Sequence, residues 1–333
     1  MRNSIKSSLL TFSAISIALA ANQTLALEIK LADVLPESHS WNVAAKGFAE
    51  DVKNQTNSRV TIKLYPSGQL GNENTLVEGL QIGSIQAGII GCGSFQPVEP
   101  KFGISELPYA WPDRQAAYAA YDGKLGDRLE NLALKHNIKI VSWWENGFRH
   151  ITNNRAPINT PKDLDGLKIR VTPDKMRLDA FIGLGASPAP LAFGELYSAL
   201  QQGVFDAQEN PLAIIYSSSF YEVQKYVSLT GHVWSPACLA FSQYTWKRMS
   251  DEDQVTVQKL ADKWRDKQRV MTQNDDSKLI KKLEDQGMVI NTVNTAPFAA
   301  AVAPVWKKYE PILGKDMIDL VKQYAAAEQT SGE

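Results

Sequence analysis

Arg170 combines a residue type and a position that suit the binding of a small anion. It lies between Ile169 and Val171 on an alternating segment that also contains Leu167. In a strand these three apolar side chains share one face, so Arg170 points to the opposite face with Lys168. Near the carboxyl end of a parallel strand, that face opens into the crevice where α/β sheets bind ligands. A guanidinium presents its donors in a fixed fork that matches a carboxylate, so the pattern predicts a carboxylate site.

A second arginine, Arg149, ends another strand-like run and is within reach of the same crevice. Two arginines around a small carboxylate would make the site selective for charge. The alternative is that either arginine pairs with a structural acid, such as Asp165 or Glu145. Residue types alone leave both interpretations open.

Asn210 is a third candidate, because it stands between Glu209 and Pro211. Proline disfavours helical geometry at the preceding residue. A buried asparagine there offers a ligand both a donor and an acceptor. The alternative is an ordinary turn asparagine.

Further candidates are apolar or lie in predicted loops. Phe193 and Trp144 would form an apolar wall beside the polar groups, or else belong to the core. His39, Ser94 and Glu73 follow strand-like or turn-like segments, where they would face a crevice or cap helices.

Composition and missing motifs argue against other classes of function. The formal net charge is −1, without the basic excess of a nucleic-acid binder. The 4 histidines form no pair with the spacing of a zinc site. Gly91-Cys-Gly93 resembles half of a dinucleotide fingerprint, but Gln96 stands where the third glycine is needed. The sequence therefore predicts no cofactor and no metal, and it favours binding without catalysis.

Strand-like and helix-like segments alternate along the chain. This alternation predicts an α/β fold with mainly parallel sheets. A long charged amphipathic helix is expected from Val257 past Leu283. No flexible linker divides the chain, so two lobes would be joined by ordered crossings. The clearest predicted strands are Glu28–Val34, Val60–Leu64, Ile138–Trp144 and Leu167–Val171.

The N-terminus has the layout of a secretory signal peptide, predicted for residues 1–26. Arg2 and Lys6 precede a largely apolar run, and Ala26 comes just before the first predicted strand. The alternative, a transmembrane anchor, needs a longer apolar run. Export would permit a disulfide between Cys92 and Cys238, although two small buried thiols fit the sequence equally well.

Several motifs together resemble one family. They include Glu145-Asn-Gly-Phe-Arg149, Gly166-Leu-Lys-Ile-Arg170 and Gln208-Glu-Asn-Pro211, preceded by Leu64-Tyr-Pro-Ser-Gly-Gln-Leu-Gly71. In this order they resemble the DctP-type receptors of tripartite ATP-independent periplasmic (TRAP) transporters. The resemblance covers nearly the whole chain after residue 26. Its details are similar to the branch that binds sugar-derived acids such as diketogulonate, uronates or aldonates.

The resemblance implies a two-lobed periplasmic binding protein fold with a ligand cleft between the lobes and a long connecting helix. Lobe I would comprise residues 27–147 plus about 236–275, and lobe II residues 148–235 plus about 276–333. It also implies a periplasmic protein that passes a small carboxylate to the integral membrane subunits of a TRAP transporter. We expect a monomer, although the sequence does not determine the oligomeric state.

The family pattern assigns roles to residues of this chain. It implies that Arg170 holds the ligand carboxylate, that Arg149 assists, and that Asn210 and Phe193 contact the ligand. Sialic-acid receptors carry a glutamate in the loop around Gly91. Because this chain lacks that glutamate, sialic acid is not expected.

Other functions remain open at this stage. A C4-dicarboxylate or keto-acid receptor of the same family fits nearly as well. A binding protein of an ATP-driven importer or a signalling receptor would share the two-lobed trap. A secreted hydrolase or lyase acting on sugar acids would need a catalytic constellation that the sequence does not contain.

Overall fold

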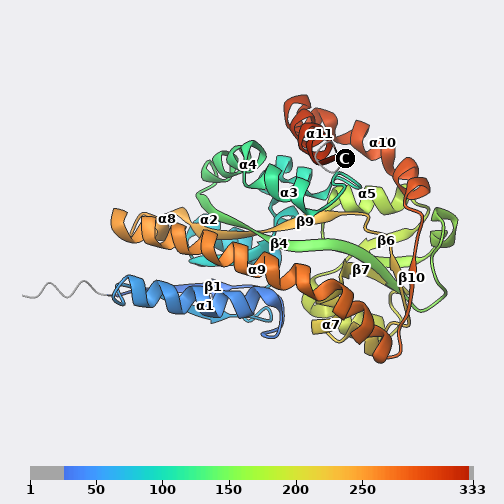
Figure 1. Ribbon diagram of the computed structural model, residues 1–333, viewed down its shortest axis with the longest axis horizontal. Helices are drawn as coiled ribbons and strands as arrows, with labels where there is room; N and C mark the ends of the chain where they lie inside the picture. The colour runs from blue at the N-terminus through green and yellow to red at the C-terminus, as the bar shows by residue number, and fades with distance from the viewer. Residues whose placement is uncertain (1–25, 330–333) are drawn as a thin grey trace, which may run out of the picture.

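The computed structural model describes residues 26–329 of the chain, but not the side chains of residues 274–277, 328 and 329. It has α/β architecture in which helices cover both faces of a mixed sheet (Figure 1). The predicted signal peptide lies outside the described residues except for Ala26. Among the described residues, no helix combines the length and the apolar character needed to cross a membrane.

One part of the sheet contains five strands in the order β2-β1-β3-β9-β4. Strand β1 pairs in parallel with both of its neighbours, whereas β9 runs antiparallel to β3 and β4. The bounds are β1 Leu27–Ala32, β2 Val60–Tyr65, β3 Ala87–Gly91, β4 Ile138–Asn153 and β9 Trp234–Ser242.

The other part of the sheet continues through β4 to β7, β5 and β6, while β8 pairs with β4 and β10. The pairs β5–β6, β5–β7 and β8–β10 are parallel. The bounds are β5 Lys168–Val171, β6 Ser187–Pro190, β7 Ala207–Pro211, β8 Tyr226–Leu229 and β10 Val289–Thr292.

Strand β4 joins the two parts because it changes partners along its length. It pairs with β9 as far as Phe148 and with β7 from Arg149 onward. The sequence pattern predicted only its first half, since Asn146 and Gly147 interrupt the apolar alternation. Gly147 has a φ of 116° at a register shift in the pairing with β9. The glycine therefore permits a bulge at the point where the strand passes between the lobes.

The prediction of mainly parallel sheets was wrong for the central strands. Each antiparallel pair among the described strands contains β4 or β9. Strand β9 was not among the predicted strands, because Pro236 interrupts an otherwise apolar run. The chain crosses from one lobe to the other in β4 and returns in β9, so these two paired strands run antiparallel.

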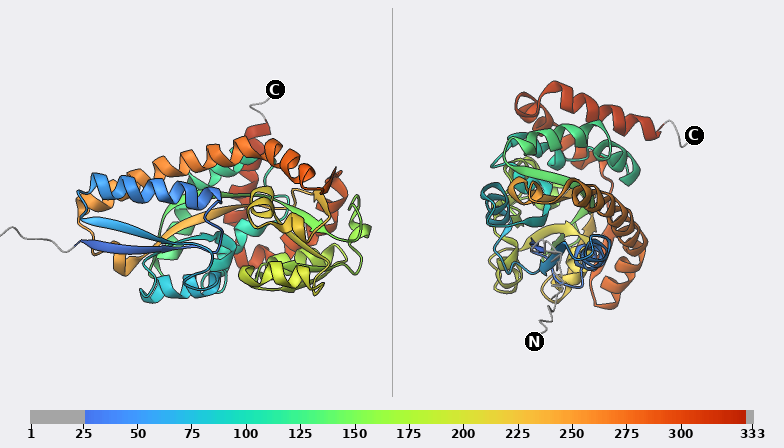
Figure 2. Two further views of the ribbon diagram at one scale, coloured as in Figure 1. Left: turned by 90° about the horizontal axis from the view of Figure 1, so that it is seen from below. Right: turned by 90° about the vertical axis from the view of Figure 1, so that its left-hand side faces the viewer.

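The helices form a layer on each face of the sheet. Helix α9, Asp251–Asp285, is the predicted long helix and runs beside α1 along the molecule (Figure 2). The remaining α-helices are α1 Ser40–Gln55, α2 Glu73–Ile82, α3 Arg114–Tyr121, α4 Lys124–Leu134, α5 Lys175–Gly183, α6 Leu196–Gln201, α7 Leu212–Ser217, α8 Gln243–Trp246, α10 Ala296–Leu313 and α11 Lys315–Gln329. Short 3-10 helices are η1 Cys92–Phe95, η2 Pro100–Glu106, η3 Pro161–Leu164, η4 Phe193–Glu195 and η5 Phe220–Glu222.

The core consists of two apolar clusters, one on each face of the sheet. Along β9, Cys238 and Ala240 belong to the cluster under α3 to α5 and α10, whereas Leu239 and Phe241 belong to the cluster under α1 and α9. Successive strand residues point to opposite faces, so β9 is buried on both sides. The central strands are therefore packed between two helical layers.

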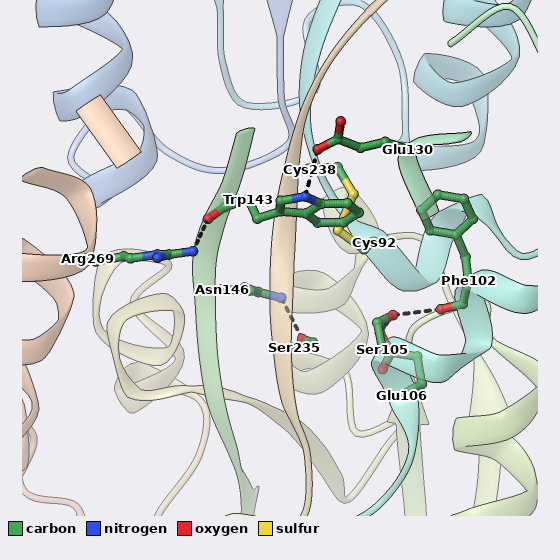
Figure 3. The surroundings of a disulfide bond; sticks show 10 residues. All are labelled: Cys92, Phe102, Ser105, Glu106, Glu130, Trp143, Asn146, Ser235, Cys238 and Arg269. Carbon is green, nitrogen blue, oxygen red and sulfur yellow. Dashed lines mark hydrogen bonds between the residues drawn. A yellow bond between two sulfur atoms is a disulfide. The ribbon is translucent and has the colours of Figure 1, made fainter. Parts of the chain in front are cut away.

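Cys92 and Cys238 form a disulfide and are not two free buried thiols (Figure 3). Their Cα atoms are 5.5 Å apart, and the bond ties η1 to β9. Both residues are fully buried in the core. The bond therefore anchors the loop after β3 to a strand that lies beside β4.

Replacing both cysteines with alanine is expected to lower the free energy of unfolding by about 2–5 kcal/mol, because the crosslink closes a long loop in the unfolded chain. Urea denaturation of the natural chain and of the Cys92→Ala/Cys238→Ala variant measures this difference. A reducing agent should lower the midpoint of the natural chain and leave that of the variant unchanged. Equal midpoints under oxidising conditions would contradict the prediction.

Candidate functional site

Most of the predicted ligand-binding residues line one cavity. Its volume is about 50 Å³, and its walls include Arg149, Asn210, Phe193, Glu73 and Ser94. These side chains come from β4, β7, η4, α2 and η1, so they belong to both of the parts of the sheet that β4 joins. Residues separated by more than one hundred positions in the sequence thus meet at the place where β4 changes partners.

Arg149 is paired with an acid, but not with either acid considered from the sequence. Its Nε lies 2.5 Å from Oε2 of Glu209, and its Nη2 donates to Oε1 of Glu209 at 3.0 Å. The same Nη2 donates to Oδ1 of Asn210 at 2.8 Å. Glu145 instead binds Arg114, with 2.6 Å between Oε1 and Nε. The fork of Arg149 therefore positions Asn210 at the cavity wall.

Glu209 is the centre of a buried ionic network. It binds Arg149, accepts from Nη1 of Arg177 at 2.9 Å, and contacts Nε2 of His232 at 3.1 Å. Burial alone would raise the pKa of Glu209, but the two arginines and the histidine hydrogen bond outweigh it and hold that pKa well below its usual range. Burial lowers the pKa of His232 despite the neighbouring carboxylate, so the ring is neutral at pH 7 and donates from Nε2.

Arg177 and Glu106 belong to this network although neither was predicted from the sequence. Arg177 lies near the start of α5 and pairs through Nη2 with Oε2 of Glu106, in η2. Both side chains are buried. Residue type and spacing indicated the burial of Arg177 only weakly, because an arginine in a short helix is usually exposed. The N-cap Asp174 accepts from the backbone N–H of Arg177 at 2.9 Å and so sets where this helix begins.

Arg170 lies behind the cavity wall rather than in its lining. Its Nε and Nη2 both donate to the carbonyl oxygen of Leu191, at 2.8 and 2.6 Å. Its Cζ is 6.0 Å from the ring centre of Phe193, which does line the cavity. Among the described residues, no carboxylate lies within 4.0 Å of its guanidinium nitrogens. Burial lowers the pKa of Arg170 to about 10, while the charges of Glu73 and Glu209 act in the opposite direction.

Asn210 is a strand residue and not a turn residue. It is paired with His150 in the β4–β7 ladder, and it is buried. Its Nδ2 donates to Oε1 of Gln208 at 2.5 Å, while its Oδ1 accepts from Arg149. Both ends of the amide are thus oriented by neighbouring side chains.

His39 and Trp144 lie outside this cavity. His39 caps α1, where its Nδ1 accepts from the backbone N–H of Trp41 at 3.3 Å. It lines a separate cavity of about 330 Å³ with Thr272 and Lys282. Burial lowers the pKa of His39 to about 3, so the ring is neutral. Trp144 is a fully buried core residue, as the second interpretation of this aromatic held.

Comparison with known proteins identifies the class of this fold. Residues 31–311 match the family model described as bacterial extracellular solute-binding protein, family 7. The chain belongs to this family. The resemblance to DctP-type receptors seen in the sequence motifs is thereby confirmed.

Individual members of the family resemble the chain over most of their length. The 2,3-diketo-L-gulonate-binding periplasmic protein of Escherichia coli (strain K12) is 33% identical over 267 residues, which are 80% of this chain and 81% of that protein. The sugar acid binding protein of Advenella mimigardefordensis strain DPN7T, solved in complex with galactonate, has a TM-score of 0.88 and 28% identity, covering 91% of this chain and 98% of that one. A TRAP periplasmic solute binding protein from Polaromonas sp. JS666, bound to D-erythronate, has a TM-score of 0.86 and 34% identity, covering 89% and 98%.

Replacing Glu209 with glutamine is expected to destabilise this family 7 protein by about 3–5 kcal/mol at pH 7, because buried Arg149 loses its counter-ion and Arg177 keeps only Glu106. The carboxylate's contribution is present above pH 4.5, its ordinary pKa, and is lost as the pH falls toward the depressed pKa of the folded state. The difference in stability between the two proteins should therefore shrink in acid.

Thermal or urea denaturation at pH 7 and at about pH 3.5 measures the Glu209 effect. Glu78→Gln is the matched control, since Glu78 is exposed on α2. A Glu209 variant as stable as the control at pH 7, or a difference independent of pH, would contradict the assignment of the network.

Proposed function

We propose that the protein is a periplasmic receptor that binds a small sugar acid and delivers it to the integral membrane subunits of a TRAP transporter. The observation that supports this function most directly is the environment of Arg170. This guanidinium is buried, it donates to a carbonyl oxygen, and no described carboxylate neutralises it. A ligand carboxylate would supply the missing charge.

The reasoning rests on the cost of burying a charge. An unpaired buried ion loses its hydration, and this loss is several kcal/mol even after relaxation. Arg149 and Arg177 avoid the cost because Glu209 and Glu106 lie against them. Arg170 has no such partner, and burial accordingly disfavours its charged form. An anion entering beside Phe193 would restore the balance with a bidentate, charge-assisted contact.

Closure of the two lobes would couple binding to transport. The cavity is lined from both ends of the sheet, and β4 connects those ends. A ligand can shift a conformational equilibrium only by the difference in its affinity for the two states. A carboxylate that contacts arginines of one lobe and polar groups of the other would favour the closed state, which the membrane subunits would then recognise.

The relatives support a sugar acid as the ligand. Diketogulonate, galactonate and erythronate, in the names of the proteins described above, each carry one carboxylate and several oxygen substituents. A C4-dicarboxylate or keto acid is the alternative within the same family. We propose binding without turnover, because the related proteins are solute receptors.

The lobe boundaries and the monomeric state stay predictions. Lobe I, at 27–147 plus about 236–275, would meet lobe II, at 148–235 plus about 276–333, close to the residues where β4 changes partners. A single chain provides both walls of the cavity, so a monomer would be sufficient for binding.

Replacing Arg170 with alanine is expected to weaken sugar-acid binding by about 100-fold or more, roughly 3 kcal/mol, since two charged hydrogen bonds are lost. Arg170→Lys should bind nearly as poorly, because a point charge cannot reproduce the fork. Isothermal titration with D-galactonate and D-erythronate measures both effects, after a thermal-shift screen has identified which acid binds.

Lys168→Ala is the matched control, because Lys168 is an exposed cation on the same strand. It should leave the affinity unchanged. If both Arg170 variants bound as tightly as the natural chain, the proposed role of Arg170 would be refuted.

A further inference from the structure

The cavity continues beyond Arg149 into a second space with a different chemical character. This space has a volume of about 30 Å³ and shares Gly91, Ser94, Asn146, Arg149 and Thr172 with the first cavity. Its other walls are Gly93, Glu106, Asp174 and Arg177. The shared residues make the two spaces adjoining parts of one site, with Phe193 at one end and two acids at the other.

The two acids lie close together around a glycine. Glu106 and Asp174 are both buried. A Cβ atom at Gly93 would lie less than 3.0 Å from Oε1 of Glu106 and from Oδ2 of Asp174. Any other residue at position 93 would therefore occupy the space between the two carboxyl groups. Glycine therefore lets both carboxyl groups approach the backbone at the cavity wall.

When it is ionised, Asp174 adds a negative charge beyond those that the arginines neutralise. Arg149 and Arg177 are already balanced by Glu209 and Glu106. Asp174 accepts from the side-chain amide of Gln96 and from the backbone N–H of Arg177, both neutral donors. Burial raises the pKa of Asp174 to about 7. Above this pKa, a second ligand carboxylate placed here would meet the negative charge of Asp174 in a dry environment, where repulsion is strong.

The same region has polar groups without partners that a hydroxyl would satisfy. Asn146 donates through Nδ2 to Oγ of Ser235 at 3.3 Å (Figure 3), and its Oδ1 is buried with no hydrogen-bond partner among the described residues. Nε of Arg177 is likewise buried without an acceptor in the described part of the chain. Buried polar groups are normally paired. A hydroxyl both donates and accepts, so it can serve an amide oxygen, a carboxylate and an N–H.

We propose that Asn146, Asp174 and Glu106 form an acceptor subsite that binds the hydroxyl end of the ligand and excludes a second carboxylate. This inference rests on the proposed function and narrows it. The preferred ligand is a hydroxylated monocarboxylate, with its carboxylate toward Arg170 and its hydroxyls toward Gly93. The corresponding diacids are poor ligands.

The test uses pairs of acids that differ only at the far end. D-Galactonate and galactarate share a carbon skeleton and differ by a terminal CH₂OH against a carboxylate. D-Erythronate and meso-tartrate form the shorter pair. Isothermal titration of the full chain at pH 8 should show the monocarboxylate of at least one pair binding about 100-fold more tightly than its diacid.

Asp174→Asn then tests which residue is responsible. Asparagine caps a helix as well as aspartate does, so α5 is expected to remain intact. The variant should reduce the preference for the monocarboxylate by about tenfold or more. Asp165→Asn, an exposed acid near the same sheet, is the matched control and should leave the preference unchanged. Melting temperatures verify that both variants fold.

The possible outcomes distinguish failure of the proposed subsite from failure of the proposed receptor function. Equal affinity of the natural chain for both members of a pair would overturn the subsite while leaving the receptor function intact. So would an Asp174 variant that folds and keeps the full preference. If no monocarboxylate of either pair bound and the diacids did, the subsite would again be wrong. If none of the four acids bound, the sugar-acid function and the subsite would both be overturned.

Discussion

The buried ionic network around Glu209 is the constraint on which the site depends. One carboxylate in β7 binds Arg149 from β4, Arg177 from α5 and His232 from the loop before β9. Each partner would be costly to bury alone, so the four side chains stabilise one another only in this arrangement. The network holds β7 against β4 where β4 leaves β9, and it orients Asn210 through Arg149. The geometry of the cavity wall follows from this pairing of charges.

On either side of this charge-balanced network, the site carries opposite charges. At one end Arg170 is a buried cation beside Phe193 without a carboxylate partner in the described chain. At the other end Asp174 is a buried acid whose described partners are neutral donors. In the proposed function, a molecule with one charged end and several hydroxyls would complement both ends at once. The disulfide between Cys92 and Cys238 supports this arrangement, because it anchors η1, which carries Ser94 and Gly93, to β9.

Much of the fold was predictable because local patterns report directly on burial. The alternation in β1, β2 and β5 predicted those strands with small errors at their ends, and the amphipathic period predicted α9, although the helix begins at Asp251 and not at Val257. Prediction failed where long-range geometry overrides local preference. Gly147 and Asn146 break the pattern in the middle of β4, yet the strand continues because β9 and β7 provide hydrogen-bond partners on either side. Strand β9 was missed in the same way. Pro236 interrupts its apolar run, yet the strand forms because β3 and β4 pair with it.

By itself, the sequence determined the class of the protein and the residue types of its site. Its family motifs indicated Arg149, Asn210 and Phe193, and their position in predicted loops indicated Glu73 and Ser94; these five side chains line one cavity. Only the tertiary structure decided which charges are paired. Arg149 and Arg170 are equivalent by residue type, but folding brings Glu209 against one of them and the carbonyl of Leu191 against the other. Such pairing depends on contacts between distant segments, and residue spacing along a chain does not encode it.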